Sequence, residues 1–177
     1  MGTHGLSCRL GTGRLARHQQ INDLVWRALE RASIPSCREP KDLMRDSEMR
    51  PDGLTLIPWK EGKCLTWDVT VAATFAATYV AATSIKAGEA AARLAANKRE
   101  KYVELTHTHL FCPIAVKTMG PFEEEGRDLL SAIGHQICKI TGDPRETSFL
   151  FQRLSVIIQR GNAAAFRGIF PRPCSDF

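Results

Sequence analysis

The sequence has no long apolar run and no closely paired cysteines. The uncharged stretch 69–85 is rich in Thr and Ala, so we expect no membrane-spanning segment. Six cysteines are scattered along the chain without a Cys-x-x-Cys pair, and no segment resembles a secretory signal. We therefore expect reduced thiols in an intracellular protein, which excludes a disulfide-stabilised secreted domain.

Acidic residues are outnumbered by basic ones. The net charge of +5 and the pI near 9.0 suit a polyanionic partner, although many basic proteins bind no nucleic acid. The apolar share of 44% is ordinary for a globular protein. A length of 177 residues fits one domain with a substantial core.

Residues 50–71 predict two strands joined by a turn. The turn, at 58–63, contains a proline, a glycine and charges that sheets exclude. Because side chains alternate along a strand, Trp67 and Val69 are expected on a core face, with Asp68 on the opposite face. Acids are depleted in strands, and burial of an unpaired charge is costly. Asp68 is therefore a candidate functional residue.

A second carboxylate, Asp52, follows Pro51 at the start of the first of these strands. A hairpin can bring Asp52 and Asp68 close enough to share one divalent cation. Mg²⁺ prefers oxygen ligands and often takes one or two carboxylates, with water and phosphate completing its shell. Such an ion polarises a phosphodiester and supplies an activated water. The alternative makes Asp52 a turn former and Asp68 a salt-bridged strand residue, and spacing alone does not separate the two.

Five short motifs occur in an order that resembles a known family. They are Arg17-His18, Arg38-Glu39-Pro40, Arg50-Pro51-Asp52-Gly53, Trp67-Asp68-Val69-Thr70 and Lys98-Arg99-Glu100-Lys101-Tyr102. Over residues 4–166 the chain resembles the C-terminal restriction-like endonuclease domain, of the PD-(D/E)xK type, of site-specific non-LTR retrotransposon polyproteins. The resemblance implies a Mg²⁺- or Mn²⁺-dependent DNA endonuclease that nicks a target site in the nucleus. It also implies separation from the reverse transcriptase, with element RNA as a partner of the missing domains.

The resemblance also assigns roles to individual residues. Asp52 and Asp68 become metal ligands. The residues expected to contact DNA are Arg14, Arg17, His18 and Arg50. His4 and Cys8 resemble the second half of a Cys-Cys-His-Cys zinc knuckle, but two ligands do not make a structural zinc site. We therefore expect no zinc in this chain.

The chain offers two candidates for the catalytic lysine. In the wider superfamily a lysine follows the second acid by two residues, and here that position is Thr70. The helix expected over residues 86–105 has a stripe that includes Leu94, Lys98, Lys101 and Leu105. We expect Lys101 to stabilise the phosphate charge, with Lys98 as the competing candidate. Lys98 is otherwise interpreted as a side chain extending along the edge of the core.

An alternative function belongs to a different class of protein. A catalytically inactive, nucleic-acid-binding remnant of the same fold is favoured by Thr70 and by the incomplete zinc knuckle. The presence of both Asp52 and Asp68 argues against it.

The remaining periodicity predicts the architecture. Apolar spacing predicts helices over residues 18–32 and 121–139 and a third after residue 143, with strands at 34–39 and 109–116. We expect an α/β fold with a small mixed sheet, a restriction-endonuclease-like core and two C-terminal helices. The expected segments are a flexible tail (1–14), the core (15–118), a helical extension of the same domain (119–167) and a frayed tail (168–177).

Overall fold

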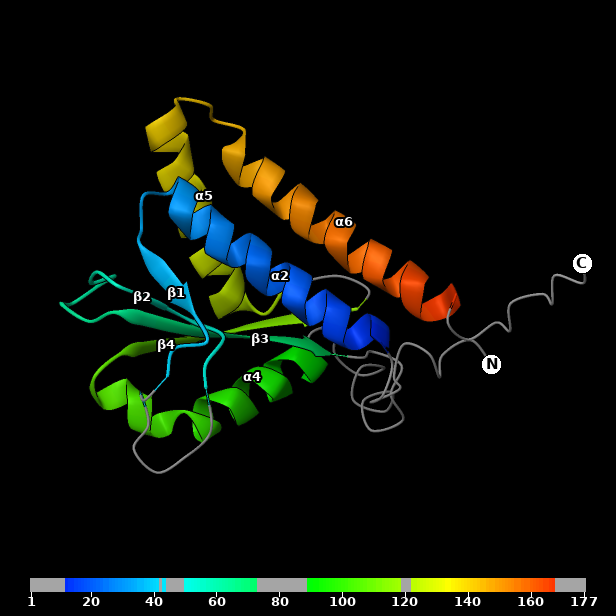
Figure 1. Cartoon of the computed structure of the whole chain (residues 1–177), viewed down its shortest axis with the longest axis horizontal. Helices are drawn as coiled ribbons and strands as arrows, with labels where there is room; N and C mark the ends of the chain where they lie inside the picture. Colours follow the sequence, from blue (N-terminus) through cyan, green and yellow to red (C-terminus); the bar gives the residue numbers. More distant parts are fainter. Residues whose placement is uncertain (1–11, 42, 44–49, 73–88, 119–121, 168–177) are drawn as a thin grey trace, which may run out of the picture.

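The computed structural model describes residues 12–41, 43, 50–72, 89–118 and 122–167 (Figure 1). The elements are α2 (Thr12–Arg31), β1 (Ser36–Arg38), β2 (Gly53–Thr55), β3 (Leu65–Ala72), α4 (Glu89–Lys101), the 3₁₀ helix η1 (Val103–His107), β4 (Leu110–Lys117), α5 (Glu124–Thr141) and α6 (Glu146–Arg167). The predicted α/β fold, with its small mixed sheet and two C-terminal helices, is confirmed.

The four strands form one sheet in the order β1-β2-β3-β4. The hairpin of β2 and β3 is antiparallel, and β1 pairs antiparallel with the outer edge of β2. Strands β3 and β4 are parallel along their whole length, from Leu65 opposite Leu110 to Ala72 opposite Lys117. Parallel neighbours need a crossover connection, and α4 lies within that connection.

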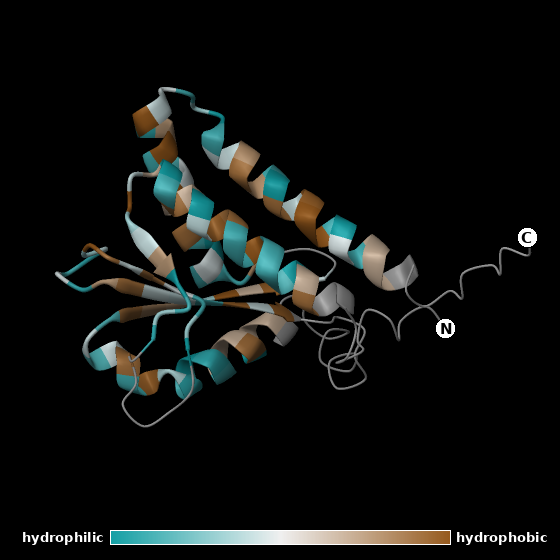
Figure 2. Cartoon of the chain, viewed as in Figure 1, coloured by the Kyte–Doolittle hydropathy of each residue, from teal (hydrophilic) through white to brown (hydrophobic). Residues whose placement is uncertain are grey.

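Helices cover both faces of the sheet. Figure 1 shows α2, α5 and α6 on one face and α4 on the other. The first face forms one apolar cluster in which Trp67 and Val69 of β3 join Ile21 of α2, Leu130 of α5 and Leu154 of α6. Figure 2 shows brown and teal residues alternating along these helices, as expected for amphipathic elements. Among the residues that the structure describes, no helix is long and apolar enough to cross a membrane.

The position of β2 depends on Trp67 and Gly53. These residues are register partners, and a Cβ added to Gly53 would lie 2.0 Å from Trp67 Cζ2. A side chain at residue 53 would therefore displace the indole ring. Trp67 Nε1 also donates a hydrogen bond of 2.9 Å to Asn22 Oδ1, which links the hairpin to α2. These contacts hold the residue before Gly53, Asp52, against the sheet.

Several predicted boundaries are wrong. Helix α2 begins at Thr12, so residues 12–14 are helical instead of part of a tail. Helix α4 ends at Lys101 and is followed by η1. Residues 1–11 and 168–177, which include the predicted tails, lie outside the described residues.

Candidate metal centre

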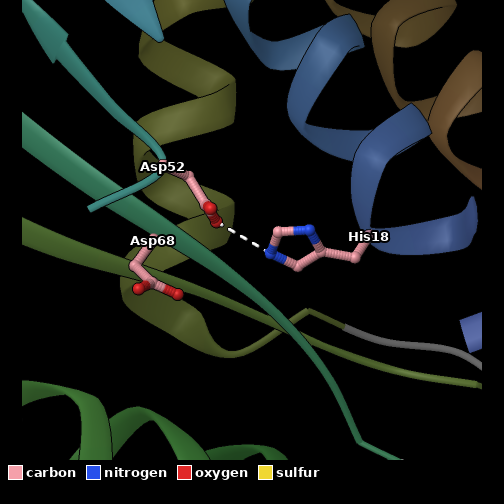
Figure 3. A group of neighbouring side chains, drawn as sticks. All are labelled: His18, Asp52 and Asp68. Atoms are coloured by element: carbon pink, nitrogen blue, oxygen red, sulfur yellow. Dashed lines mark ion pairs between the residues drawn. The ribbon is translucent and has the colours of Figure 1, made fainter. Parts of the chain in front are cut away.

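Three side chains from three separate elements meet at one end of the hairpin. His18 comes from α2, Asp52 from the residue before β2, and Asp68 from the middle of β3 (Figure 3). One ligand atom from each lies within 4.8 Å of the other two. His18 Nε2 and Asp52 Oδ2 are 3.0 Å apart. This is the arrangement that the sequence predicts for the two acids, with an imidazole added.

Hydrogen bonds fix both ends of Asp52. Its Oδ2 accepts a hydrogen bond of 2.6 Å from the backbone N–H of Val69. Its backbone carbonyl accepts from Asn22 Nδ2 at 3.3 Å and from the N–H of Glu39 at 3.1 Å. The carboxylate is therefore oriented by β3, and the main chain is held by α2 and by the end of β1. Oriented ligands of this kind are typical of metal sites.

Asp68 is the buried member of the group, with a relative exposure of 3%. Lys98 Nζ lies 2.7 Å from its Oδ1 as an ion pair. Among the described residues, however, this buried oxygen has no hydrogen-bond donor in normal geometry. Desolvation raises the pKa of the Asp68 carboxyl, Asp52 raises it further, and Lys98 and Tyr102 oppose both. A cation between the two carboxylates would relieve their repulsion and satisfy Asp68 Oδ1.

His18 is half-buried and belongs to the centre itself. The hydrogen bond with Asp52 raises the pKa of His18, burial opposes this, and the charges of Asp52 and Asp68 raise it further. The protonated ring donates to Asp52, whereas the neutral ring offers a lone pair to a metal. The sequence places His18 near the site, in contact with DNA or positioning a group, but does not name it as a candidate ligand. The available signal was its spacing of four residues from Asn22, which puts both on the face of α2 toward Asp52.

Of the two candidate lysines, the one next to the acids is not the one that the sequence favours. Lys98, and not Lys101, is paired with Asp68. Lys101 is exposed, and its Nζ lies 3.3 Å from the hydroxyl and 4.8 Å from the ring centroid of Tyr102. Lys98 is partly exposed, and its ammonium reaches the buried carboxylate of Asp68.

The reason lies in which residues of α4 face the sheet. The buried positions of this segment are Ala91, Ala95, Tyr102 and Leu105. Ala95 and Tyr102 were left out of the predicted stripe, and they move its centre toward Lys98. Lys101 is three residues further on, about 60° around the helix at roughly 100° per residue, and so projects from the flank.

Arg17 does not lie on a DNA-facing surface, which corrects the expectation. It is 1% exposed, and its Nη1 donates a hydrogen bond of 2.7 Å to Asn162 Oδ1 on α6. Asn162 Nδ2 in turn donates to the carbonyl of Thr118 at 2.5 Å. Arg17 is four residues before the core residue Ile21 and therefore shares its buried face. Its role is to join α2 to α6.

Gly161 provides the space for this arginine. A Cβ on Gly161 would lie 1.9 Å from Arg17 Cγ. Gly161 is therefore a close-packing position. It allows α6 to approach α2 directly behind His18.

Among the other predicted site residues, Arg50 is the one whose side chain lies in the described part of the chain. Arg50 is exposed, and its backbone carbonyl accepts a hydrogen bond of 2.8 Å from the Tyr102 hydroxyl. Arg14 lies within α2, but its side chain is outside the described part of the chain. His4 and Cys8, the predicted zinc half-site, are also outside the described residues.

The centre offers two carboxylates, one imidazole and one neighbouring ammonium group. It is the one group of three or more potential metal ligands within the described ranges. Carboxylates suit Mg²⁺ and Mn²⁺, and the imidazole extends the range to transition metals. No protein-family model matches the chain, and no curated protein sequence matches it closely enough to be a relative.

Proposed function

We propose that this chain is a metal-dependent DNA endonuclease that hydrolyses phosphodiester bonds. The observation that carries the proposal is the convergence of Asp52, Asp68 and His18 within 4.8 Å, with Lys98 2.7 Å from Asp68. The order of motifs along the chain extends the proposal to target-site nicking by a restriction-like nuclease of a non-LTR retrotransposon. DNA in the nucleus is the proposed partner.

Asp52 and Asp68 are the proposed ligands of Mg²⁺ or Mn²⁺. One carboxylate is oriented by a backbone N–H, and the other is buried and paired with Lys98 through its Oδ1. Two such acids close together resist joint ionisation unless a cation lies between them. When bound, a divalent ion polarises the phosphodiester and lowers the pKa of a coordinated water.

Lys98 is the proposed electrostatic stabiliser of the phosphate. It extends from α4 to the face of β3 that carries Asp68 and Thr70. In the resembled superfamily, that face delivers the lysine from the position occupied here by Thr70. An ammonium at this place balances the charge that develops on the phosphate in the transition state. Asp68 orients the ammonium, so the acid both binds metal and positions the lysine.

His18 is the proposed partner of Asp52. Its ring orients one Asp52 oxygen through the 3.0 Å contact, and its neutral form adds a nitrogen ligand. Mn²⁺ accepts imidazole more readily than Mg²⁺ does, because Mg²⁺ prefers an oxygen-only shell. The chain should therefore work with Mg²⁺ and bind Mn²⁺ more tightly.

Plasmid nicking tests the proposal. Supercoiled DNA should be converted to the open circle in Mg²⁺ and left intact in EDTA. Asp52→Asn and Asp68→Asn should each abolish conversion, because each loses a charged ligand. Asp128→Asn is the matched control, since Asp128 is an exposed acid on α5. Wild-type nicking by either site variant would contradict the metal assignment.

One observation favours the non-catalytic alternative. Both carboxylates already have internal cationic partners, His18 for Asp52 and Lys98 for Asp68. The group would then be a charge network that joins α2, the hairpin and α4 in a nucleic-acid-binding module. Calorimetry with Mn²⁺ separates the two functions. Salt-dependent DNA binding without metal binding would favour the alternative.

A further inference from the structure

A cavity adjoins the candidate metal centre on the outer side of His18. It has a volume of about 750 Å³ and lies between the N-terminal half of α2 and the end of β1. Lining residues on α2 include Ala16, His18, Gln19 and Asn22, and those at the end of β1 are Arg38 and Glu39. Ligand sites commonly occupy about 300–1,000 Å³, so the cavity has room for a small organic group.

His18 lines the cavity and belongs to the metal centre, and the two are also linked through the backbone of Asp52. Its carbonyl accepts hydrogen bonds from Asn22 Nδ2 and from the N–H of Glu39, and both residues line the cavity. The Asp52 carboxylate contacts His18 and the backbone N–H of Val69. A nucleic-acid strand with a phosphate at this carboxylate would therefore bring an adjacent nucleotide to the mouth of the cavity.

The charges of the lining disfavour phosphate as the occupant. Arg38 is offset by Asp23, which lies 3.3 Å from its Nη1, and Glu39 adds a further negative charge. Apart from His18, the cavity thus has no excess of positive charge. Phosphate sites in proteins depend on such an excess or on helix N-termini. A neutral, polar occupant fits the lining better than an anion does.

The polar groups suit the edge of a nucleobase. Gln19 is exposed on the cavity side of α2 and offers both a donor and an acceptor, the pair that glutamine uses to bind adenine. Glu39 offers an acceptor for an exocyclic amino group. The Arg38 guanidinium lies 4.9 Å from the centroid of the Trp26 ring. Its planar group therefore forms part of the cavity lining. Guanidinium planes are common stacking surfaces for unpaired bases.

We propose that this cavity binds one unpaired nucleobase of the strand held at the metal centre. The inference rests on the proposed nuclease function and adds a subsite to it. A base enters such a cavity only after it leaves its stack, so a strand with an unpaired nucleotide beside the cleaved bond binds best. Gln19 and Glu39 read the edge of the base, and Ala16 leaves the space that the base fills.

Binding of a modified strand tests the subsite without any need for cleavage. The probe is an oligonucleotide of abasic nucleotides, compared with the same backbone carrying one central adenine, in Ca²⁺, which takes oxygen ligands as Mg²⁺ does. The wild-type chain should bind the adenine strand about 10-fold more tightly, the scale of one good base-edge contact. Ala16→Trp should remove the difference by filling the cavity, and Gln19→Leu should reduce it by removing the amide.

Two exposed positions on α6 supply matched controls, Ala164→Trp and Gln152→Leu, which make the same changes away from the cavity. Both should keep the preference for adenine. Equal binding of the two strands by the wild-type chain would overturn the subsite, as would an unchanged preference in Ala16→Trp. Nicking in Mg²⁺ without a preference for adenine would contradict the subsite alone. A preference for adenine without nicking would leave the subsite standing and contradict the nuclease.

Discussion

The two faces of β3 differ in composition and in cover. One face carries Trp67 and Val69 and is closed by α2, α5 and α6, which share a single apolar cluster with it. The other carries Asp68 and Thr70 and lies toward α4, where Ala91 and Ala95 pack on Ala115 of β4. The first face supplies the apolar burial that holds the fold together. The second face has small residues that let α4 come close and carry the charges of the candidate site.

The largest expected effect on stability lies on the apolar face. Trp67→Ala removes a fully buried indole and its hydrogen bond to Asn22, so it should lower the free energy of unfolding by ~3–5 kcal/mol. Asp68→Asn, the next residue on the opposite face, should abolish nicking with a much smaller effect on stability. Urea denaturation of both variants checks this contrast. Equal losses of stability would contradict the contrast between an apolar face that stabilises the fold and a polar face that carries the candidate site.

The second prediction concerns the lysines of α4. Lys98→Ala should lower the single-turnover rate of DNA cleavage by ~10²-fold, the scale of removing one electrostatic stabiliser. Lys101→Ala should change it little, because the Lys101 ammonium contacts Tyr102 and not a carboxylate. DNA affinity should stay similar in both variants. A slower reaction with Lys101→Ala than with Lys98→Ala would restore the order expected from the sequence.

The lysines show where sequence reasoning reaches its limit. Alternation along β3 predicted the two faces correctly, because strand periodicity is strict and local. The helical stripe was misjudged, because small and aromatic residues define its centre. Ala95 and Tyr102 are buried, but neither was counted as part of the stripe. A difference of about 60° around a helix decides which ammonium reaches Asp68, and only packing fixes that angle.

Local sequence patterns do not predict contacts between residues that are far apart in the chain. Arg17 meets Asn162 across 145 residues, so the sequence around Arg17 alone does not reveal the partner that its buried guanidinium binds. His18, the next residue, projects about 100° further around the helix and meets Asp52. The sequence predicts that Arg17 or His18 contacts DNA or positions a group near the site. In the structure, the first residue anchors α2 in the fold and the second belongs to the candidate site.

A third prediction concerns the close packing of Gly161 of α6 against Arg17 of α2. Gly161→Ala should lower the free energy of unfolding by ~1–3 kcal/mol, because the new methyl group overlaps Arg17 Cγ. Its effect should shrink when Arg17 is replaced by alanine, which removes the overlapping atoms. A double-mutant cycle measured by denaturation gives this coupling directly. Additive effects of the two substitutions would contradict the close packing of α6 on α2.

The smallest predicted effect is a pH dependence on the polar face. The hydrogen bond to Asp52 raises the pKa of His18 above its ordinary 6.5 in the folded chain. Folding therefore favours the proton on His18. The stability gained is fully present below the unfolded value of 6.5 and is lost as the pH rises through the higher folded value. In metal-free buffer, the melting temperature of the wild type should fall over this interval more than that of His18→Gln. Glutamine keeps a neutral donor toward Asp52 but does not titrate.

Other charged groups near His18 also have to be considered in the comparison of the two melting curves. Asp68 and Lys98 face the same centre, and both remain in His18→Gln, so their charges are present in the two proteins alike. The pKa of the Asp68 carboxyl is also raised in the folded chain, so this group too lowers the stability as the pH rises. Its contribution begins at the ordinary pKa of 3.8. Added Mn²⁺ should favour the neutral ring and flatten the wild-type curve. Parallel melting curves for the two proteins would show that His18 and Asp52 are not coupled. The imidazole would then lie beside the carboxylates without contributing to the centre.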